Sequence, residues 1–544
     1  MEIFKIQDLT YYYPESEIAA LKEISLSIEE GELIFLTGYS GCGKSSLLKA
    51  MAGLLPDFYG GKIGGIIEYK GKDLRRWDKR KLPREIGIVF QDPEQQTCMT
   101  VVEHEVAFGL ENLGIPLDEM RHRVVEVLTM LNLTHLKDRS IFELSNGQKQ
   151  RVILASILAM HPKVLILDEP TSQLDPIAAD EILDYIYRLN RDWGTTIILS
   201  EQRIERCFDM ADRVLIMDKG NIIFNGTPHE ATLSSNDTEP LESFFPPISK
   251  IFRAVGLNSI PINVKEGRKA IKNLSDGQRN ISIPLGRSKI EAKNDILVEG
   301  RRVRYVYPDQ FFSIDNMDFT FYGGEVAAIF GENGAGKSTL LKLISGILKP
   351  QKGHIRVKGD VGYISQNPND YLFSNTVYEQ LLFALELKGM KDTGQIDEIL
   401  KKLHIYRYRD VNPRDLSGGE KQRVAIATVI VSDPSVILMD EPTRGMDSLA
   451  KNELSSIISS LIEEGKAIVL VTHDIEFAAE LSQRVLIMSR GNLVAEGDMH
   501  SMIGSSFYYS TQTAKLFRNI DSRVVTIKEG IYVLNKLVDR RHEQ

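Results

Sequence analysis

The chain has 544 residues, which is too many for one hydrophobic core and predicts roughly two to four domains. Hydrophobic residues make up 42% of the chain and charged residues 26%, which is ordinary for a globular protein. The net charge of −9 argues against a protein that coats nucleic acid. No apolar run reaches the ~18 residues of a membrane span, and the first residues do not resemble a signal peptide. Three cysteines (Cys42, Cys98 and Cys207) form no disulfide framework, so we expect a cytosolic protein.

The first motif in the chain is a glycine-rich loop between a predicted strand and a predicted helix. Residues 38–45 read GYSGCGKS, follow the apolar run 33–36 and precede the helical pattern 46–50. This is the Walker A pattern, in which glycines let backbone N–H groups surround phosphate oxygens and the helix N-terminus adds donors. Glycine turns before helices are common, but the GKS ending after an apolar strand is specific. We expect Lys44 to reach the β- and γ-phosphates of a nucleotide and Ser45 to ligate Mg²⁺.

The same motif occurs a second time. Residues 331–338 read GENGAGKS after the apolar run 326–330, and Lys337 lies 293 positions after Lys44. The sequence therefore predicts two copies of one nucleotide site. The residues predicted to bind ATP in the two loops are Gly38, Ser40, Gly41, Gly43, Lys44, Ser45 and Ser46, and then Gly331, Asn333, Gly334, Gly336, Lys337, Ser338 and Thr339.

A tyrosine–proline pair lies about thirty residues before the lysine of each loop, at Tyr13 and at Tyr307. Such a tyrosine could be an aromatic residue of an edge strand. Alternatively, its flat apolar face could stack on adenine. The matched placement in both halves favours stacking.

After each loop comes a strand that ends in glutamine. Gln91 follows the run 86–90 and Gln366 follows the run 361–365. The distance from the loop lysine to the glutamine is 47 positions in the first half and 29 in the second, so the first half is expected to carry a longer hairpin. A glutamine at the end of a buried strand could contact the metal and the attacking water.

Two further motifs recur with identical spacing. A serine opens each of two predicted helices, in LSNGQKQR (144–151) and LSGGEKQR (416–423), at a capping position. The serine precedes an aspartate–glutamate pair by 23 positions in both halves, and each pair ends a fully apolar strand. Two acids at a strand end could simply be solvated, but the preserved spacing argues against that interpretation. The pairs are Asp168-Glu169 and Asp440-Glu441.

The repeat extends beyond these motifs. Phe252-Arg253 and VKEG (264–267) are echoed by Phe517-Arg518 and IKEG (527–530), so each half is expected to be a core plus an appended segment. Alternating apolar strands and helices indicate α/β cores around mostly parallel sheets. The predicted parts are a first domain (1–232), its appended segment (233–275), a linker (276–295), a second domain (296–503) and its appended segment (504–544).

The order of these motifs resembles the ATP-binding cassette (ABC) ATPases. The resemblance covers both cores, about four fifths of the chain, and implies two tandem P-loop NTPase domains of the α/β class. In that family two cassettes pack head to tail, and each ATP lies between the Walker A motif of one cassette and the signature of the other. Because both cassettes are in one chain, the cassette dimer would be intramolecular.

The resemblance assigns roles to individual residues. Glu169 and Glu441 would polarise the attacking water as general bases, and Asp175 and Asp447 match the D-loop aspartate that communicates across the dimer. The ligands of Mg²⁺, direct or through water, would be Ser45, Gln91 and Asp168, and in the second cassette Ser338, Gln366 and Asp440. The signature residues facing ATP would be Ser145, Gly147 and Gln148, and Ser417, Gly418, Gly419 and Glu420.

Two departures from the family pattern distinguish the sites. The switch histidine is present as His473, whereas the first cassette has Gln202, which can hydrogen-bond the γ-phosphate but cannot carry a charge. The first signature has Asn146 in place of glycine; if that position needs a left-handed backbone, weakening rather than loss is expected. Our hypothesis is that both sites bind ATP, and that the site with the second Walker motifs, His473 and the Asn146 signature does most of the hydrolysis.

The segments after the two glutamines indicate a partner. QDP (91–93) and QNP (366–368), with TVVE (100–103) and TVYE (376–379), resemble the ATPases of energy-coupling factor (ECF) transporters, which import vitamins and metal ions. The resemblance implies a peripheral protein on the cytoplasmic face of the cell membrane, bound to a membrane T component and a substrate-binding component. Another kind of ABC importer could show the same grouping, so that alternative stays open.

A hypothesis from another class is a twin-cassette ATPase that acts on ribosomes, like the ABC-F translation factors. Such a protein would be expected to carry a basic linker that reaches RNA. Residues 236–298 contain ten Lys or Arg against seven Asp or Glu, which is poor support for a nucleic-acid partner. The three scattered cysteines exclude an iron–sulfur recycling factor.

Overall fold

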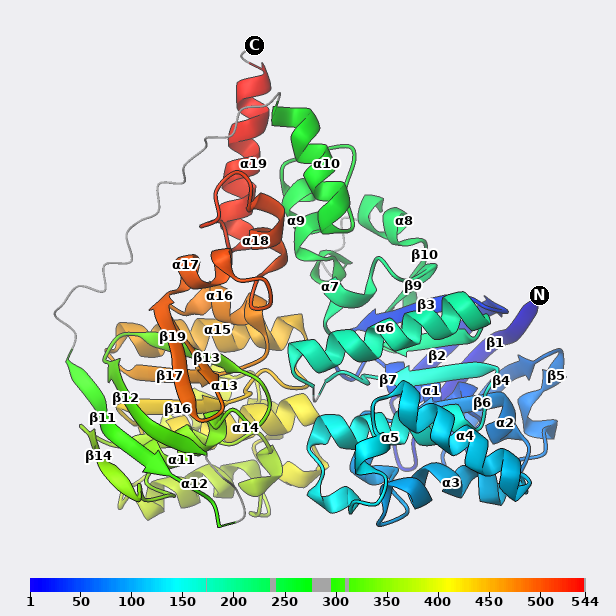
Figure 1. The fold of residues 1–544 in the computed structure, drawn as a ribbon, viewed down its shortest axis with the longest axis horizontal. Coiled ribbons are helices and arrows are strands. Elements are labelled where there is room, and N and C mark those ends of the chain that lie inside the picture. The colour runs from blue at the N-terminus through cyan, green and yellow to red at the C-terminus, as the bar shows by residue number, and fades with distance from the viewer. Residues whose placement is uncertain (173, 235–240, 276–294, 309–312, 543–544) are drawn as a thin grey trace. The chain divides into compact units, whose positions relative to one another are not determined.

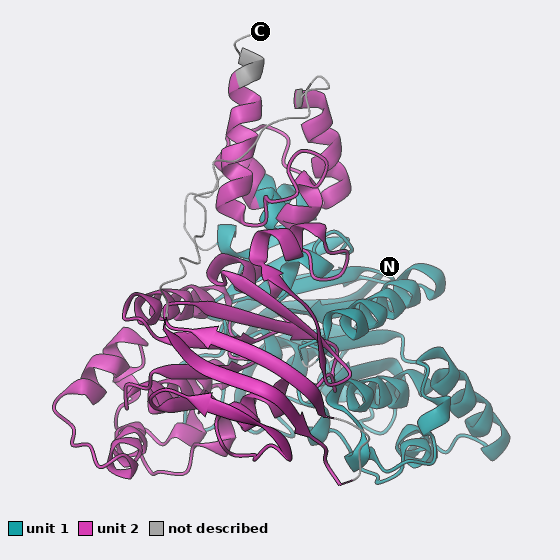
Figure 2. Cartoon of the chain, turned by 60° about the vertical axis from the view of Figure 1, so that its left-hand side comes forward, with its two compact units in different colours: residues 1–249 teal, residues 250–544 magenta. Residues whose placement is uncertain are grey.

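The computed structural model describes residues 1–172, 174–234, 241–275, 295–308 and 313–542 (Figure 1). The chain divides into two compact units, residues 1–249 and 250–544 (Figure 2). Each unit contains one six-stranded, mostly parallel sheet and one smaller antiparallel sheet. The predicted α/β class and the duplication are therefore confirmed.

The first unit is built on two sheets. Their strands are β1 (Glu2–Tyr12), β2 (Leu21–Glu29), β3 (Leu33–Gly38), β4 (Lys62–Tyr69), β5 (Lys72–Asp73), β6 (Ile86–Val89), β7 (Val164–Asp168), β8 (Thr196–Ser200), β9 (Arg213–Asp218) and β10 (Asn221–Gly226). The larger sheet has the order β10-β9-β3-β8-β7-β6, and only β10 runs antiparallel to its neighbour. Every residue of β3, β7 and β8 is buried, as is typical of parallel strands that are covered on both faces. The smaller sheet has the order β2-β1-β4-β5.

The helices of the first unit lie between these strands in the chain, except that the last two follow the last strand, β10. They are α1 (Lys44–Met51), α2 (Leu82–Glu85), α3 (Val102–Asn112), α4 (Leu117–Met130), α5 (Asn146–Ala159), α6 (Pro176–Trp193), α7 (Ile204–Cys207), α8 (Pro228–Leu233) and α9 (Pro247–Ala254). The longer connection predicted between Lys44 and Gln91 is present, because β5, a 3₁₀ turn (Leu74–Arg76) and α2 lie between β4 and β6. In the second unit the corresponding strands follow each other after three residues.

The second unit repeats the plan. Its strands are β11 (Ile296–Tyr305), β12 (Ile314–Tyr322), β13 (Val326–Gly331), β14 (Lys352–Val357), β15 (Val361–Ile364), β16 (Val436–Asp440), β17 (Ala467–Val471), β18 (Arg484–Ser489) and β19 (Asn492–Asp498). The sheet orders are β15-β16-β17-β13-β18-β19 and β12-β11-β14. The helices are α10 (Val264–Ser275), α11 (Lys337–Ile344), α12 (Val377–Leu387), α13 (Gln395–Lys402), α14 (Gly418–Ile430), α15 (Ser448–Glu463), α16 (Ile475–Leu481), α17 (Met499–Ser505), α18 (Gln512–Phe517) and α19 (Ile527–His542).

The appended segments lie close together in the fold. The boundary between the compact units falls inside α9, so that α10 belongs to the second unit, where it contacts α18 and α19. The guanidinium of Arg268 on α10 donates to the backbone oxygen of Lys515 on α18 at 2.5 Å from Nη2 and 3.1 Å from Nε. The predicted linker, residues 276–295, lies almost wholly outside the described residues.

Candidate active sites

In each unit, the predicted functional loops leave the same edge of the six-stranded sheet. In the first unit the glycine loop follows β3, Gln91 lies just after β6, Glu169 follows β7, and Gln202 lies just after β8. These four strands are parallel, so their carboxyl ends meet at one edge. Ligands of open α/β sheets bind at such an edge. In the second unit, β13, β15, β16 and β17 repeat the arrangement.

The two glycine loops are closed around their own lysines. Nζ of Lys44 donates to the backbone oxygens of Gly38 at 2.8 Å and of Tyr39 at 3.0 Å, and the lysine is buried. Lys337 makes the matching bonds to Gly331 at 2.8 Å and to Glu332 at 2.9 Å. Both loops thus hold an ammonium group where the sequence predicts phosphates.

A glycine is required at the start of each loop helix. Gly43 is the N-cap of α1 with φ of 106°, and a Cβ there would meet the backbone oxygen of Ala20 at 2.5 Å. Gly336 caps α11 with φ of 98°, and a Cβ there would meet the backbone oxygen of Ser313. Both the left-handed backbone and the close approach exclude other residues.

The serine after each lysine bonds to the aspartate at the end of the neighbouring strand. Ser45 bonds to the carboxylate of Asp168, and Ser338 bonds to that of Asp440. Burial raises the pKa of both aspartates, and these bonds and the loop lysines oppose the shift. A hydroxyl beside a carboxylate is the kind of hard oxygen pair that Mg²⁺ prefers.

The donor set fits a metal only in part. Within the described ranges, no group of three or more His, Cys, Asp or Glu side chains is placed to hold an ion. Mg²⁺ at Ser45 and Asp168 would therefore need further oxygen ligands, from the phosphates of the nucleotide or from water. That requirement is consistent with the position of the pair beside the glycine loop.

Glu169 is held by two amide side chains. Nε2 of Gln91 donates to Oε2 of Glu169 at 2.7 Å, and Nε2 of Gln202 donates to Oε1 at 2.7 Å. Burial raises the pKa of the Glu169 carboxyl to about 7; the Lys44 ammonium opposes this shift, and the neighbouring carboxylates add to it. A buried carboxylate of this pKa, with both oxygens oriented, is suited to polarise a water molecule.

In the second unit a histidine takes the place of one amide. Nε2 of His473 lies 3.4 Å from Oε1 of Glu441, and the backbone N–H of His473 donates to Oε2 at 3.1 Å. The histidine side chain is 9% exposed and the glutamate 13%. The strand pairing aligns Ser200 with Asp168 and Val471 with Asp440, so Gln202 and His473 occupy equivalent positions, as the sequence comparison predicted.

Both glutamates have an unusual backbone conformation. The φ angle is 49° at Glu169 and 52° at Glu441, in the left-handed region that non-glycine residues seldom adopt. Strained residues of this kind gather at functional sites, where the surrounding structure enforces them. Here the backbone N–H of each glutamate bonds across to the adjacent strand, to Ser200 at 2.9 Å and to Val471 at 2.8 Å.

The two signature serines are helix N-caps, as predicted. Ser145 precedes α5, and its backbone N–H donates to Oε1 of Gln148 at 3.0 Å, while the N–H of Gln148 donates to Oγ of Ser145 at 3.3 Å. Ser417 precedes α14 and bonds to Glu420 through its N–H at 2.9 Å and its hydroxyl at 2.7 Å. These are capping boxes. They leave the first turns of both helices ordered with Gly147 and Gly419 buried.

The position of Asn146 does not have the left-handed backbone on which its expected effect depended. Asn146 is the first residue of α5 and has no positive φ, and Gly418 at the equivalent position of α14 has none either. A Cβ added at Gly418 would meet nothing within 4 Å. The idea that this position needs a left-handed backbone was therefore wrong. Asparagine fits without strain, and its effect has to come from the side chain itself.

The D-loop aspartates also cap helices. Oδ1 of Asp175 accepts from the backbone N–H of Ala178 at 2.9 Å at the start of α6, and Oδ1 of Asp447 accepts from Ala450 at 2.9 Å at the start of α15. Each has the geometry of an N-cap. Communication across a cassette dimer stays a prediction for both.

The two tyrosines proposed to stack on adenine lie at strand ends. The hydroxyl of Tyr13 is 3.0 Å from Oγ of Ser46 in α1, which places the tyrosine beside the first glycine loop. Its ring meets Tyr11 edge-on at 4.9 Å, and Tyr307 meets Tyr305 in the same manner at 5.0 Å. Stacking on adenine stays a prediction.

Sequence reasoning missed two features near the first site. Tyr39 of the glycine loop donates a hydrogen bond to Ser243 at 3.2 Å and packs against Phe244 at 4.7 Å, so the short 3₁₀ turn Leu241–Phe244 touches the loop. Glu201, beside Gln202, is 1% exposed. The equivalent residue of the second unit is Thr472, and this difference between aligned halves was the signal that could have revealed Glu201.

The chain is similar to known proteins of one family. The ABC transporter family model matches residues 21–172 and 314–444. An ABC transporter ATP-binding protein of Clostridium tetani is 41% identical over 80% of this chain and 99% of its own length. Another from Methanosarcina acetivorans is 34% identical over 92% of this chain and 86% of its own length.

Solved structures also resemble the chain. An archaeal ribosome recycling factor, solved with a ribosomal stalk protein, matches 91% of this chain and 91% of its own with a TM-score of 0.61, at 22% identity that indicates the fold alone. Within the described residues, no helix is both long and apolar enough to cross a bilayer. The family match and these relatives show that the chain belongs to the ABC transporter ATP-binding proteins and is an ATP-hydrolysing enzyme with two ABC ATPase domains.

Proposed function

We propose that this ATPase powers ECF-type import of a vitamin or a metal ion through separate membrane subunits. ATP would be hydrolysed at two composite sites, each combining the Walker motifs of one cassette with the signature of the other. Mg²⁺ held by Ser45 and Asp168, or by Ser338 and Asp440, would neutralise phosphate charge. The protein would then lie at the cytoplasmic face of the membrane. The main support is the set of contacts around Gln91.

Gln91 begins a segment that is linked to two parts of the catalytic machinery. Its amide contacts Glu169 at 2.7 Å, and the next residue, Asp92, caps the 3₁₀ turn Pro93–Gln95 by accepting from the N–H of Glu94 at 3.1 Å. The carboxylate of Glu94 pairs with Lys149 of the signature helix α5 at 2.6 Å. A partner docked on this segment would therefore act on both the catalytic glutamate and the signature helix.

The second cassette has exposed aromatic side chains close to the equivalent segment. Phe373 lies shortly after the 3₁₀ turn Pro368–Asp370, and its ring meets that of Phe383 on α12 edge-on at 5.1 Å. Phe373 is 53% exposed and Phe383 is 39% exposed. Adjoining exposed aromatics mark interaction sites more often than ordinary surface. A short helix from a membrane subunit is the occupant that we propose.

We further propose that the two sites differ in turnover. His473 can take up a proton near the γ-phosphate, whereas Gln202 at the equivalent position stays neutral. The site that contains His473 and Glu441 is therefore the main site of hydrolysis in this proposal. The site that contains Gln202 and Glu169 binds ATP and turns over slowly.

The test of the transport proposal is purification of the tagged full chain from detergent-solubilised membranes, with and without ATP. We expect one multi-span membrane protein and one small membrane protein to co-purify. The double variant Phe373→Glu/Phe383→Glu should lose both partners and keep its own ATPase activity. Val494→Glu, at a residue that is 59% exposed on β19, is the matched control and should keep them.

Other outcomes have distinct meanings. Multi-span subunits without a small partner would indicate a different class of importer. Ribosomal proteins without a membrane partner would overturn the transport proposal and would leave the ATPase assignment intact. Retention of both partners by the double variant would contradict the docking surface.

A further inference from the structure

Glu201 is a buried carboxylate that the catalytic roles above do not use. It follows the last residue of β8, directly precedes Gln202, and is 1% exposed. Its Oε1 accepts a hydrogen bond from the backbone N–H of Thr171 at 2.8 Å. Thr171 lies between Glu169 and the N-cap Asp175, so Glu201 binds the start of the D-loop.

A second contact joins the same two loops further along. Arg206, on α7, donates through Nη1 to the backbone oxygen of Pro176 at 3.1 Å, and Nη1 lies 2.9 Å from Oδ1 of Asp180 on α6. Arg206 and Arg203 are also the positive charges that act on Glu201. The segment 201–206 therefore holds the D-loop at both of its ends, residues 171 and 176.

The second cassette fixes the equivalent loops in another way. Thr472 occupies the position of Glu201, and its hydroxyl accepts from the N–H of Asp474 within its own loop at 3.0 Å. Asp474 then pairs with Lys451 on α15 at 2.6 Å. In this pair the acid, Asp474, follows His473 and the base, Lys451, lies on the helix after the D-loop. The Arg206–Asp180 pair of the first cassette has the opposite arrangement of charges.

We propose that Glu201 is a positioning residue of the first cassette, which joins the loop of Gln202 to the D-loop so that the two respond to nucleotide as one body. An acceptor on a long side chain is needed to reach the N–H of Thr171, and threonine at this position is too short. The ATP-dependent setting of Asp175 would therefore depend on Glu201.

The first experiment is hydrogen exchange of the full chain, followed in the peptide that covers residues 168–178. In Glu201→Ala and Glu201→Thr the amide of Thr171 should exchange at least about tenfold faster, because it loses its acceptor. Glu201→Gln keeps an acceptor oxygen of the same reach and should stay within about threefold of the parent. Thr472→Ala, with the peptide of the second D-loop, is the matched control and should leave that peptide unchanged.

The second experiment measures ATP hydrolysis by the first site in a Glu441→Gln background. Glu201→Ala should lower kcat while leaving KM for ATP within about twofold, because Glu201 bonds to the D-loop and not to the nucleotide loop. Glu201→Gln should restore most of the kcat. If this background shows no hydrolysis, the change in exchange of residues 168–178 on adding ATP and Mg²⁺ replaces kcat as the measure.

Three results would overturn the proposal. Unchanged exchange at Thr171 in Glu201→Ala would show that the hydrogen bond does not hold the D-loop. Faster exchange spread through β7 and β8 would show a general structural role instead. Equal effects of Glu201→Gln and Glu201→Ala would show that the acceptor oxygen is not what matters.

Discussion

Nε2 of Gln202 lies 2.7 Å from Oε1 of Glu169 and donates a hydrogen bond to it, so the amide oxygen of Gln202 is not bonded to Glu169. The corresponding distance from Nε2 of His473 to Oε1 of Glu441 is 3.4 Å. The two glutamates at the ends of β7 and β16 therefore have different partners at this position. Of these two partners, the amide of Gln202 does not ionise, whereas an imidazole such as that of His473 can gain a proton.

This difference predicts unequal effects of removing the two bases. Glu441→Gln should reduce steady-state ATP turnover of the full chain by about 10²-fold or more, whereas Glu169→Gln should reduce it by less than about threefold. Gln202→His, in the Glu441→Gln background, should raise the residual rate. Turnover that Glu169→Gln abolishes and Glu441→Gln leaves intact would reverse the assignment of the main site.

The helix start at Gly418 predicts that asparagine can replace this glycine without loss of stability. Since Asn146 and Gly418 both start right-handed helices, Gly418→Asn should change the free energy of unfolding by no more than about 0.5 kcal/mol. Denaturant titration measures this change. A lower ATPase rate in the folded variant would then report a contact of the asparagine side chain. A loss of more than about 1 kcal/mol would show that the backbone at this position is constrained after all.

The cysteines predict two separable rates of thiol modification. Cys42 is 3% exposed, and burial raises the pKa of its thiol against the effect of Lys44, so it should react slowly with a maleimide. Cys98 is exposed and should react first, without loss of ATPase activity. In Cys98→Ser the remaining slow phase should inactivate the enzyme, and ATP should protect it. Mass spectrometry of the modified peptides distinguishes the two sites, and inactivation that ATP leaves unchanged would contradict this assignment.

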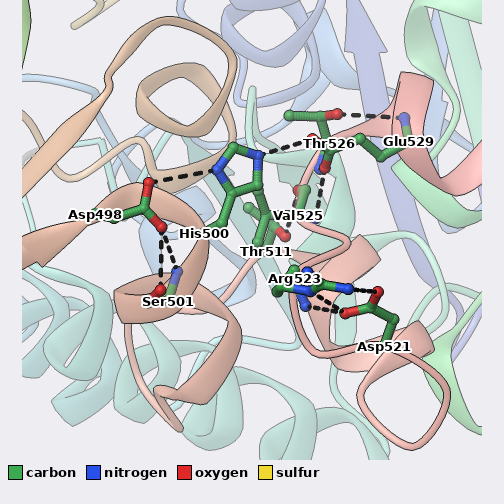
Figure 3. Close-up of polar contacts among 9 residues, drawn as sticks. All are labelled: Asp498, His500, Ser501, Thr511, Asp521, Arg523, Val525, Thr526 and Glu529. Atoms are coloured by element: carbon green, nitrogen blue, oxygen red, sulfur yellow. Dashed lines mark hydrogen bonds and ion pairs between the residues drawn. The ribbon is translucent and has the colours of Figure 1, made fainter. Parts of the chain in front are cut away.

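His500 predicts a pH-dependent stability of the C-terminal region (Figure 3). Its Nε2 lies 2.8 Å from Oε1 of Glu529 on α19, and its Nδ1 lies 3.8 Å from Oδ1 of Asp498. The hydrogen bond to Glu529 raises the pKa of His500 against the effect of burial. Burial acts to raise the pKa of Glu529. The hydrogen bonds from His500 and from the backbone N–H groups of Thr526 and Val525 outweigh burial, so the pKa of Glu529 is lowered.

The raised pKa of His500 and the lowered pKa of Glu529 determine how the stability of this region changes with pH. The contribution of His500 is fully present below its ordinary pKa of about 6.5 and is lost as the pH rises through the raised value. That of Glu529 is lost only as the pH falls through its lowered value. Hydrogen exchange of the α19 amides should therefore accelerate between pH 6 and pH 8.5 by more than the intrinsic pH dependence of amide exchange. His500→Gln should remove that additional acceleration. His122→Gln is the control, because His122 is 80% exposed and lies 4.0 Å from Glu126. An identical excess in His500→Gln would contradict the prediction.

Sequence reasoning reached the parts of the sites that depend on local pattern. The glycine loops, the apolar strands and the serine N-caps are set by residues that are close in sequence, so motif and periodicity predicted them. The left-handed backbone of Glu169 and Glu441 depends on bonds to β8 and β17, which no local pattern encodes. The hydrogen bond between Glu201 and Thr171 joins residues thirty positions apart in the chain, so no local pattern predicts it.

The placement of α10 has a consequence for how the polypeptide can be divided. This helix follows the first cassette in the chain, yet Arg268 is bonded to α18 and Ile271 is buried in the second unit. A fragment that stops at residue 275 would present the apolar side of α10 to water, and the complementary fragment would lack a helix on which α18 and α19 pack. Two halves expressed as separate polypeptides would therefore have to associate through α10 of the first half, docked on α18 and α19 of the second.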